Sequence, residues 1–263
     1  MQNKTKTDWG SVSESYDKYL NSDKNYHSQI IIPNLFRMIG PVKGKSLLDI
    51  ACGQGQISDE LHRMGAAVEA FDAGKELINI AIKNNRNINY KVANAEDFAG
   101  EYFDKNSNKY QSFDVIICVL ALQNIENFKK VIDNIKVVSN KDTRIFFVIN
   151  HPSFRIPKYS SWVYDMVGKE DVQIRRVEKY MSEDKIKLDM TPGVRKENEK
   201  EYTYSYHRPL QYYFKILSKN DMAVIRLEEW ISNRESSGKH SVRENIARKE
   251  FPLFMCLEIK NSV

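Results

Sequence analysis

Residues 47–58, LLDIACGQGQIS, place a short apolar run directly before two glycines. The run at 47–50 is typical of a strand that is buried on both faces. Gly53 and Gly55 end the strand, and the apolar spacing over 57–64 predicts an amphipathic helix. In such a strand–turn–helix, missing β-carbons let a ligand approach the backbone, and the helix N-terminus offers N–H groups. The stretch therefore predicts a ligand-binding α/β protein.

Two residues near the glycine turn indicate which kind of ligand it binds. Asp49 lies at the end of the strand, and Ser58 stands where the dinucleotide fingerprint G-x-G-x-x-G has its third glycine. A carboxylate beside the turn repels a pyrophosphate and attracts an ammonium group. The pattern D-x-x-x-G-x-G therefore favours a cationic nucleoside that carries an amino acid over a dinucleotide. A glycine turn without any ligand is the alternative.

The motif resembles the first motif of the class I S-adenosylmethionine-dependent methyltransferases, of the small-molecule, ubiquinone-biosynthesis-like type. The resemblance spans residues 40–150 by motifs and 209–263 by pattern alone. It implies a Rossmann-like three-layer α/β sandwich with a seven-stranded, mostly parallel sheet and an antiparallel last strand. It also implies S-adenosyl-L-methionine as the cofactor, held by Tyr16, Asp49, Ala51, Gly53, Gly55, Gln56, Asp72, Ala73, Asn94, Ala95, Glu96, Val119 and Leu120.

The rest of the chain fits such a sheet. Five strand–helix pairs in succession argue for one right-handed parallel arrangement. By the resemblance, the last two strands close the sheet as an antiparallel hairpin. The strands expected after the first lie at 67–71, 88–93, 113–119, 143–150, 223–230 and 251–259, and the expected helices lie at 9–20, 27–39, 75–84, 126–138 and from 210 onward.

The expected strands divide the chain into three parts. Residues 1–40 are expected to form an N-terminal helical cap, and residues 41–150 with 209–263 the cofactor-binding domain. Residues 151–208 are too long for a loop, so they are expected to be a substrate lid with a helix at about 173–182 and a strand at about 201–206. A cap that only packs on the sheet, or that makes a dimer, is the alternative.

Two polar residues at strand ends are expected to contact the nucleoside. Asp72 follows the second strand, 19 residues after Gly53, where a carboxylate can accept both ribose hydroxyls. It can also be the N-cap of the helix 75–84. Asn94 stands where the family often has Asp beside the adenine, and its amide oxygen can still accept a hydrogen bond.

The acceptor side of the site is less defined by the sequence. Gln123 stands where relatives often carry a histidine, and it can orient an acceptor but is no strong base. His27, His151 and His207 are the candidates for a base, and Arg155 can bind a carboxylate or a phosphate. A lone histidine is as readily structural. These five residues are the predicted catalytic set.

Composition limits the partners. The net charge is +5, with 40 basic and 35 acidic residues and no basic block, which disfavours nucleic acid. The insertion is nearly neutral and rich in tyrosine, which favours a small organic acceptor. Three widely spaced cysteines, no apolar run of about 18 residues and no signal peptide at the N-terminus predict a reduced, cytoplasmic protein without a bound metal or a membrane span.

The expected protein is therefore a monomeric or homodimeric S-adenosylmethionine-dependent enzyme that methylates a small molecule. An RNA methyltransferase (tRNA or rRNA) on the same fold is one alternative. An NAD-dependent oxidoreductase and a non-catalytic S-adenosylmethionine-binding protein are two others, and fold alone does not separate them.

Overall fold

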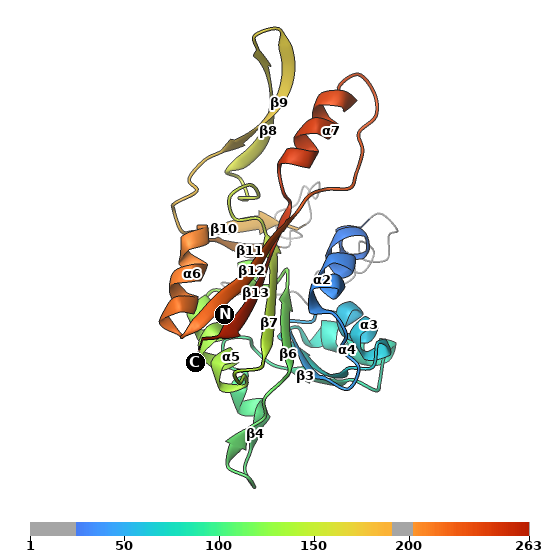
Figure 1. The fold of residues 1–263 in the computed structure, drawn as a ribbon, viewed down its shortest axis with the longest axis vertical. Coiled ribbons are helices and arrows are strands. Elements are labelled where there is room, and N and C mark those ends of the chain that lie inside the picture. Colours follow the sequence, from blue (N-terminus) through green and yellow to red (C-terminus); the bar gives the residue numbers. More distant parts are fainter. Residues whose placement is uncertain (1–24, 191–201, 263) are drawn as a thin grey trace.

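A seven-stranded sheet forms the centre of the computed structural model, which describes residues 25–190 and 202–262. Its strand order is β3-β2-β1-β6-β7-β13-β12. All neighbours pair in parallel except β13, which is antiparallel to both β7 and β12 (Figure 1). The strands are β1 (Ser46–Ile50), β2 (Ala67–Asp72), β3 (Asn89–Val92), β6 (Val115–Val119), β7 (Arg144–Asn150), β12 (Met222–Trp230) and β13 (Phe254–Asn261). The predicted sheet, with its antiparallel last strand, is confirmed.

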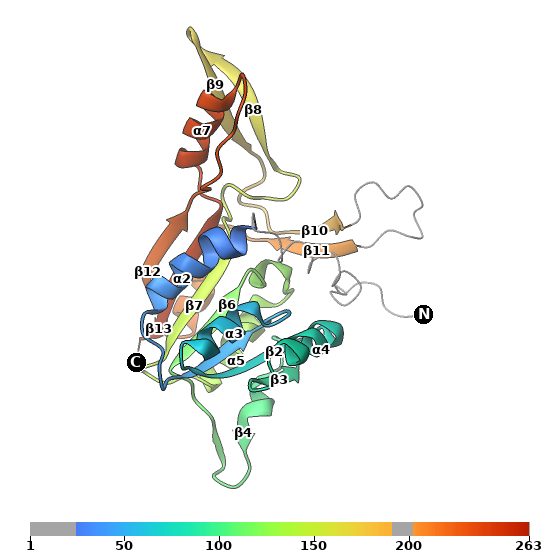
Figure 2. The ribbon, with the colours of Figure 1, turned by 90° about the vertical axis from the view of Figure 1, so that its right-hand side faces the viewer.

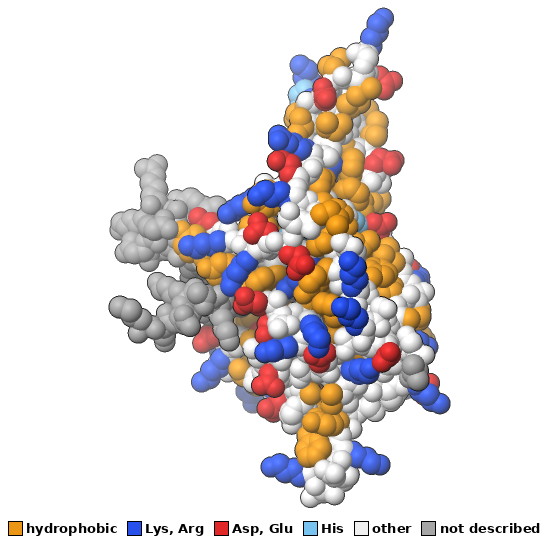
Figure 3. Space-filling view, turned by 90° about the vertical axis from the view of Figure 1, so that its left-hand side faces the viewer, with side chains coloured by type: hydrophobic (Ala, Val, Ile, Leu, Met, Phe, Trp, Pro, Cys, Tyr) orange, Lys and Arg blue, Asp and Glu red, His pale blue; other side chains and the backbone are white. Residues whose placement is uncertain are grey.

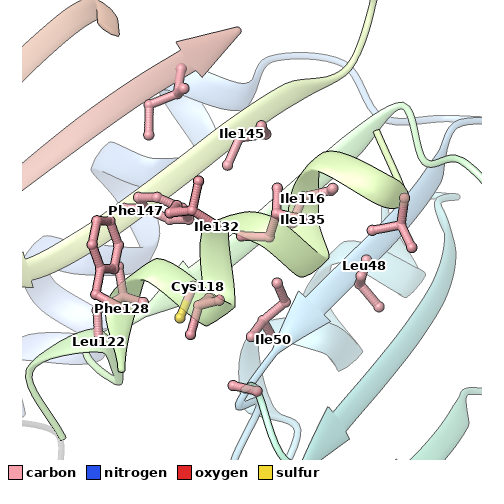
Figure 4. Close-up of a cluster of buried hydrophobic side chains, with 14 of the residues drawn as sticks. Leu48, Ile50, Ile116, Cys118, Leu122, Phe128, Ile132, Ile135, Ile145 and Phe147 are labelled. Atoms are coloured by element: carbon pink, nitrogen blue, oxygen red, sulfur yellow. The ribbon is translucent and has the colours of Figure 1, made fainter. Parts of the chain in front are cut away.

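The central strands separate two apolar cores. Leu47 of β1 packs into one core with the helices α2 (Ile32–Ile39) and α3 (Gln56–Arg63). Leu48, the next residue, packs into the other core with α5 (Phe128–Val137) and α6 (Leu210–Lys219) (Figure 4). Successive residues of a strand point to opposite faces, so the apolar residues of one strand, Leu47, Leu48 and Ile50, fill both cores.

The helices predicted outside the insertion are observed where the structure describes them. The helix α4 (Lys75–Asn84) follows β2 as expected. The segment 27–39 is a π-helical turn, His27–Ile31, that continues into α2, with Pro33 in the first turn of α2, where a missing N–H is tolerated. The helix expected at 9–20 lies outside the described residues.

The insertion between β7 and α6 contains two hairpins. The strands β8 (Ser160–Val167) and β9 (Glu170–Val177) form the first, and β10 (Asp184–Asp189) and β11 (Tyr202–His207) form the second. The strand expected at about 201–206 is confirmed as β11. The helix expected at about 173–182 is wrong, because the segment up to Val177 is the strand β9, paired antiparallel with β8.

Two segments contain helices or strands that were not expected from the sequence. The polar segment 232–249 leads into a helix, α7 (Ser241–Glu250), which contacts β9. The surface excursion at 99–112 contains a 3-10 turn, Ala99–Tyr102, and a short hairpin of β4 (Phe103–Asp104) and β5 (Lys109–Tyr110).

The cysteines agree with the sequence analysis. Cys118 and Cys256 are buried in the two cores, Cys52 is partly buried, and all three are free thiols. The described residues contain no cluster of His, Cys, Asp and Glu that could hold a metal ion. Among residues 25–190 and 202–262, no helix is long and apolar enough to cross a membrane.

The two glycines of the turn have different surroundings, which leads to a prediction. Both have positive φ, 58° at Gly53 and 78° at Gly55. A β-carbon at Gly53 would meet nothing within 4 Å, whereas one at Gly55 would overlap the Tyr90 hydroxyl and lie 3.1 Å from Ala81 Cβ. Urea unfolding should show that Gly55→Ala lowers the free energy of unfolding by about 1–3 kcal/mol more than Gly53→Ala does.

Adding Tyr90→Phe to Gly55→Ala provides the control. It removes the overlapping hydroxyl while keeping the ring, so part of the lost stability should return. Equal stabilities of Gly53→Ala and Gly55→Ala would contradict this account of the turn.

Candidate functional site

Two adjoining cavities lie at the carboxyl ends of β1, β2 and β6. This is where open α/β sheets bind ligands, because the chain order reverses beside β1. The larger cavity has a volume of about 230 Å³ and the smaller about 50 Å³, and Ala51, Gly53 and Val119 line both. Of the predicted cofactor residues, the larger cavity also contains Asp72, Ala73, Asn94, Ala95, Glu96 and Leu120, and the smaller contains Asp49 and Gln56.

Asp72 is held in place by the backbone at the larger cavity. Its two carboxylate oxygens accept hydrogen bonds from the N–H groups of Gly53, at 3.0 Å, and Gly74, at 2.8 Å. Burial raises the pKa of Asp72, and these N–H groups offset part of the shift. Each oxygen retains acceptor capacity for a further donor. The N-cap of α4 is Gly74, so the capping role considered for Asp72 is wrong.

Asp49 lies at the smaller cavity and is almost fully buried. The Ser58 hydroxyl, at 2.6 Å, donates a hydrogen bond to its carboxylate. Burial raises the pKa of Asp49 to about 7, with a smaller contribution from the negative charge of Asp72, although the Ser58 hydrogen bond opposes the shift. Ser58, which replaces the third glycine of the dinucleotide motif, is thus a partner of Asp49.

The smaller cavity offers hydrogen-bond acceptors beside Asp49. Gln56 lines it, and its Oε1 is buried without a hydrogen-bond partner among the described residues. His27 lines it as well, and burial lowers the pKa of His27 to about 4, so the imidazole is neutral near pH 7. A buried acceptor without a donor is costly, so this cavity is suited to a ligand with cationic N–H groups.

The segment after β6 is fixed by hydrogen bonds and by backbone conformation. Ala51 and Leu120, which follow β1 and β6, both have positive φ, of 57° and 52°, and both line the larger cavity. The Leu120 N–H donates to Val148 O, and its carbonyl accepts from Gln123 Nε2. The backbone of Leu120, one of the predicted cofactor-binding residues, is therefore already hydrogen-bonded within the protein.

Arg208 joins this segment to the end of the insertion. Its buried guanidinium donates to the carbonyls of Leu122, Ile125 and Glu126 at 2.7–3.2 Å. Gln123 lies outside both cavities, whereas its neighbour Asn124 lines the larger one together with Ile125 and Glu126.

The insertion contributes Tyr206 to the larger cavity, which sequence reasoning missed. His207, the next residue on β11, is buried on the opposite face and its Nε2–H donates to Tyr180 O at 2.8 Å. Alternation along β11 puts Tyr202, Tyr204 and Tyr206 on one face, and that period-two pattern is the signal that could have identified Tyr206.

His151 and Arg155 lie away from both cavities. His151 Nδ1 accepts from the Ser153 N–H, so the proton is on Nε2, which contacts Glu229 Oε1 at 2.6 Å. The guanidinium of Arg155 lies 5.1 Å from the centre of the Phe254 ring. These contacts indicate a structural role for both residues. The catalytic roles of His151, Arg155 and His207 stay predictions.

Two predicted cofactor residues are not part of the cavities as described. Gly55 lines neither cavity and packs beside Tyr90. Tyr16 lies outside the described residues. Asn94 lines the larger cavity as expected, but its Oδ1 already accepts from the Glu96 N–H at 3.0 Å, which leaves it one lone pair for a ligand.

Comparisons with known proteins agree with this geometry. A family model described as a methyltransferase domain matches residues 41–204. The chain is 29% identical over 136 residues to the ubiquinone biosynthesis O-methyltransferase of Coxiella burnetii, covering 50% of this chain and 52% of the relative. It is 32% identical over 108 residues to the enzyme of that name from Actinobacillus pleuropneumoniae, covering 40% and 45%. The chain thus spans about half the length of the curated relatives it matches.

Solved structures share the fold. An S-adenosylmethionine-dependent methyltransferase from Mesorhizobium loti superposes with a TM-score of 0.64 at 19% identity, over 87% of this chain and 96% of that one. Another from Clostridium acetobutylicum has a TM-score of 0.60 at 15% identity, over 97% and 99%. With the family model covering more than half of its length, the chain belongs to the methyltransferase domain family, as its resemblance to the class I S-adenosylmethionine-dependent enzymes predicts.

Proposed function

We propose that this chain transfers the methyl group of S-adenosylmethionine to a small organic acceptor. The observation that carries the proposal is the placement of two buried carboxylates, Asp49 and Asp72, on the two sides of the Gly53 turn. One lies in each cavity, so a ligand that spans the turn would meet both. A nucleoside with an amino-acid side chain has a matching pair of groups, two ribose hydroxyls and an ammonium.

The donors and acceptors of the two cavities fit this cofactor. In the smaller cavity, Asp49 and Gln56 Oε1 would accept from the ammonium, and a neutral His27 does not repel a cation. In the larger cavity, Asp72 would accept the ribose hydroxyls while Asn94 and the backbone at Ala95 would face the adenine. A pyrophosphate would instead approach the carboxylate of Asp49, which disfavours a nicotinamide cofactor.

The residues of the chain would contribute to catalysis by positioning the two substrates. The cofactor supplies a methyl group that its sulfonium already activates, so alignment of the acceptor and exclusion of water can supply much of the rate. His27, with its lowered pKa, is a weak base near neutral pH, and His151 already uses the lone pair of Nδ1. This favours an acceptor that reacts without a strong protein base.

Charge supports a small acceptor over RNA. The nearly balanced composition leaves no basic block, and Lys185 of β10 is paired with Glu126, at 3.5 Å, beside the larger cavity. Nucleic-acid sites rely on lysines and arginines that contact phosphates. A cytoplasmic location and the lid role of residues 151–208 remain predictions that accompany this proposal.

Calorimetry followed by an activity screen tests the proposal. S-Adenosylhomocysteine should bind and NAD should not, and a screen over thiols, amines, phenols and tRNA should find methylation of a small molecule whose rate depends little on salt. Binding of NAD alone would exclude the proposed function. Methylation of tRNA with an affinity that falls steeply with salt would favour the RNA alternative.

A matched pair on β11 tests the role of the insertion. Tyr206→Ala should weaken S-adenosylhomocysteine binding about 2- to 10-fold, because an aromatic wall of the larger cavity is lost. His207→Ala should leave that affinity within about twofold and lower the free energy of unfolding by about 1–3 kcal/mol, because a buried hydrogen bond to Tyr180 is lost. Titration calorimetry and urea unfolding measure the two effects.

Turnover of His207→Ala tests the sequence-based prediction. Should turnover fall at least about tenfold while the variant stays folded under the assay conditions and its cofactor affinity is unchanged, His207 would act on the acceptor as predicted. An unaltered affinity of Tyr206→Ala would remove Tyr206 from the site.

A further inference from the structure

The first turn of α3 carries a hydroxyl that contacts the end of β1. The helix begins at Gln56, directly after the glycine turn, and lies beside α4 in both ribbon views (Figures 1 and 2). Ser58, its third residue, is fully buried. The Ser58 hydroxyl donates to Asp49 Oδ2 at 2.6 Å, a length typical of a hydroxyl bound to a charged oxygen. Because Ser58 is buried, bulk water does not compete for this contact.

The hydrogen bond leaves the other oxygen of the carboxylate for a ligand. Among the residues that the structure describes, no donor contacts Asp49 Oδ1. Asp49 and Gln56 both line the smaller cavity, where an ammonium group would find their oxygens. A carboxylate bound at one oxygen rotates less freely, so its second oxygen keeps a constant direction toward a ligand. A glycine at position 58, as in the dinucleotide motif, has no side chain to do this.

The other groups around Asp49 do not stabilise its negative charge. The titratable groups that interact with it electrostatically or share its cavity are His27, Cys52, Asp72, Tyr90 and Cys118. Burial lowers the pKa of the histidine to about 4 and raises the pKa values of both thiols and the phenol, so these four are neutral near pH 7. The fifth is a carboxyl group, and its charge opposes the ionisation of Asp49.

Charges farther away do not replace the hydroxyl either. On α3 itself, Asp59 is paired with Arg63. On the surface, Figure 3 shows Lys and Arg side chains interspersed with Asp and Glu, so their fields largely cancel, and salt screens them beyond about 8 Å. The charge of Asp49 therefore depends mainly on the hydrogen bond from Ser58.

We propose that Ser58 is a positioning residue, whose hydroxyl orients and stabilises the Asp49 carboxylate for the ammonium group of the cofactor. The inference rests on the function proposed above. Ser58 lines neither cavity, so it would act on the cofactor only through Asp49. Its hydroxyl would then decide above which pH the chain binds the cofactor well.

Unfolding of the unliganded chain at several pH values tests the link between the two residues without any cofactor. In the wild type the free energy of unfolding should fall as pH rises from about 4 to about 7, because the pKa of Asp49 is about 7 when folded. Ser58→Ala removes a hydrogen bond to a charged group, so this pKa should rise by about one to two units. The fall in stability should then continue to about pH 8–9.

Thr143→Val is the matched control. Thr143 is also fully buried, and its hydroxyl donates to Phe113 O at 2.6 Å. It precedes β7, at the end of the parallel strands opposite to Asp49. The control should lower the free energy of unfolding at every pH and leave the pH range of the fall as in the wild type.

Titration calorimetry with S-adenosylhomocysteine tests the effect on binding. At pH 7, Ser58→Ala should bind about 5- to 50-fold more weakly than the wild type, and the deficit should shrink to about fourfold or less at pH 8.5, where more of the carboxylate is ionised. Thr143→Val should bind as the wild type does. In the Asp49→Asn background, Ser58→Ala should leave the affinity within about twofold, because the group through which it acts is gone.

Two outcomes would overturn the proposal. The first is a Ser58→Ala chain whose stability levels off near pH 7, as in the wild type. The second is an affinity deficit that is equal at pH 7 and pH 8.5 or that persists in the Asp49→Asn background, because Ser58 would then support the fold alone. A wild type that binds no S-adenosylhomocysteine, with a shifted unfolding range in Ser58→Ala, would refute the proposed function and support the control of Asp49 by Ser58.

Discussion

Asp72→Ala is expected to weaken S-adenosylhomocysteine binding by about 1.5–3 kcal/mol for each charged hydrogen bond to the ribose that it removes. The carboxylate lines the larger cavity and is oriented by the N–H groups of Gly53 and Gly74. Two oxygens in fixed positions can accept two vicinal hydroxyls, which a water-filled cavity cannot replace at equal strength. Isothermal titration calorimetry at one pH and salt concentration measures the change.

Asp72→Asn separates ligand contacts from support of the turn. Alanine also leaves the Gly53 and Gly74 N–H groups without their acceptor, so some loss of affinity could come from a displaced turn. Asparagine keeps one acceptor oxygen and the shape but loses the charge, and its affinity should lie between those of the wild type and the alanine variant. An affinity unchanged in both variants would exclude Asp72 from the site.

The sequence predicted the sheet and the part of the site that topology determines. Leu47, Leu48 and Ile50 place apolar side chains on both faces of β1, which lies between two cores, so the buried character of this strand was visible without a structure. Asp49, Gly53 and Asp72 stand at the ends of neighbouring parallel strands, and such ends meet at one edge. The order of the strands along the chain was therefore enough to predict that these three residues lie close together.

The insertion shows where this reasoning stops. The strands β8 and β9 are largely exposed and paired with each other rather than with the main sheet, so burial did not distinguish β9 from a helix. On β11 a shift of one residue decides which side chain faces the cavity, and the prediction chose His207 where the structure places Tyr206. Register is a tertiary property, because the pairing with β10 and the packing beneath it set the face.

Contacts between residues far apart in the chain could also not be predicted from the sequence. His151 was predicted as a candidate base, and the structure shows that Glu229 of β12, 78 residues away, accepts a hydrogen bond from its Nε2–H. Arg208 was noted only as the end of the insertion, and it proves to hold the carbonyls that follow β6. In both cases the partner is a group that no local pattern connects to the residue.

Asp49→Asn is expected to make the unliganded protein more stable while it removes most of the affinity for the cofactor. The pKa of Asp49 is about 7 in the folded chain, against 3.8 as the ordinary value, chiefly because the carboxyl is buried. Between these two pH values the folded state binds a proton that the unfolded state has released. The free energy of unfolding therefore falls as pH rises from about 4 to about 7, and levels off above.

Asparagine has no charge to bury and keeps an oxygen that can accept from the Ser58 hydroxyl. At about pH 8 the variant should exceed the wild type by on the order of 2–4 kcal/mol in the free energy of unfolding, and the difference should vanish near pH 4. Urea unfolding at several pH values measures this. Equal stability at pH 8 would show that Asp49 is not held at a raised pKa.

Binding should depend on pH in the opposite sense. A cationic ammonium requires the ionised carboxylate, so the wild-type affinity for S-adenosylhomocysteine should rise up to about tenfold per pH unit from about pH 5.5 and level off near pH 7. In Asp49→Asn the affinity should be low and nearly constant over this range, since no group at that position titrates. A variant that binds as tightly as the wild type at pH 7.5 would contradict the assignment of Asp49 to the ammonium. Because the same burial that destabilises the ionised carboxylate strengthens its attraction for a cation, loss of stability and gain of binding have one physical cause at this residue.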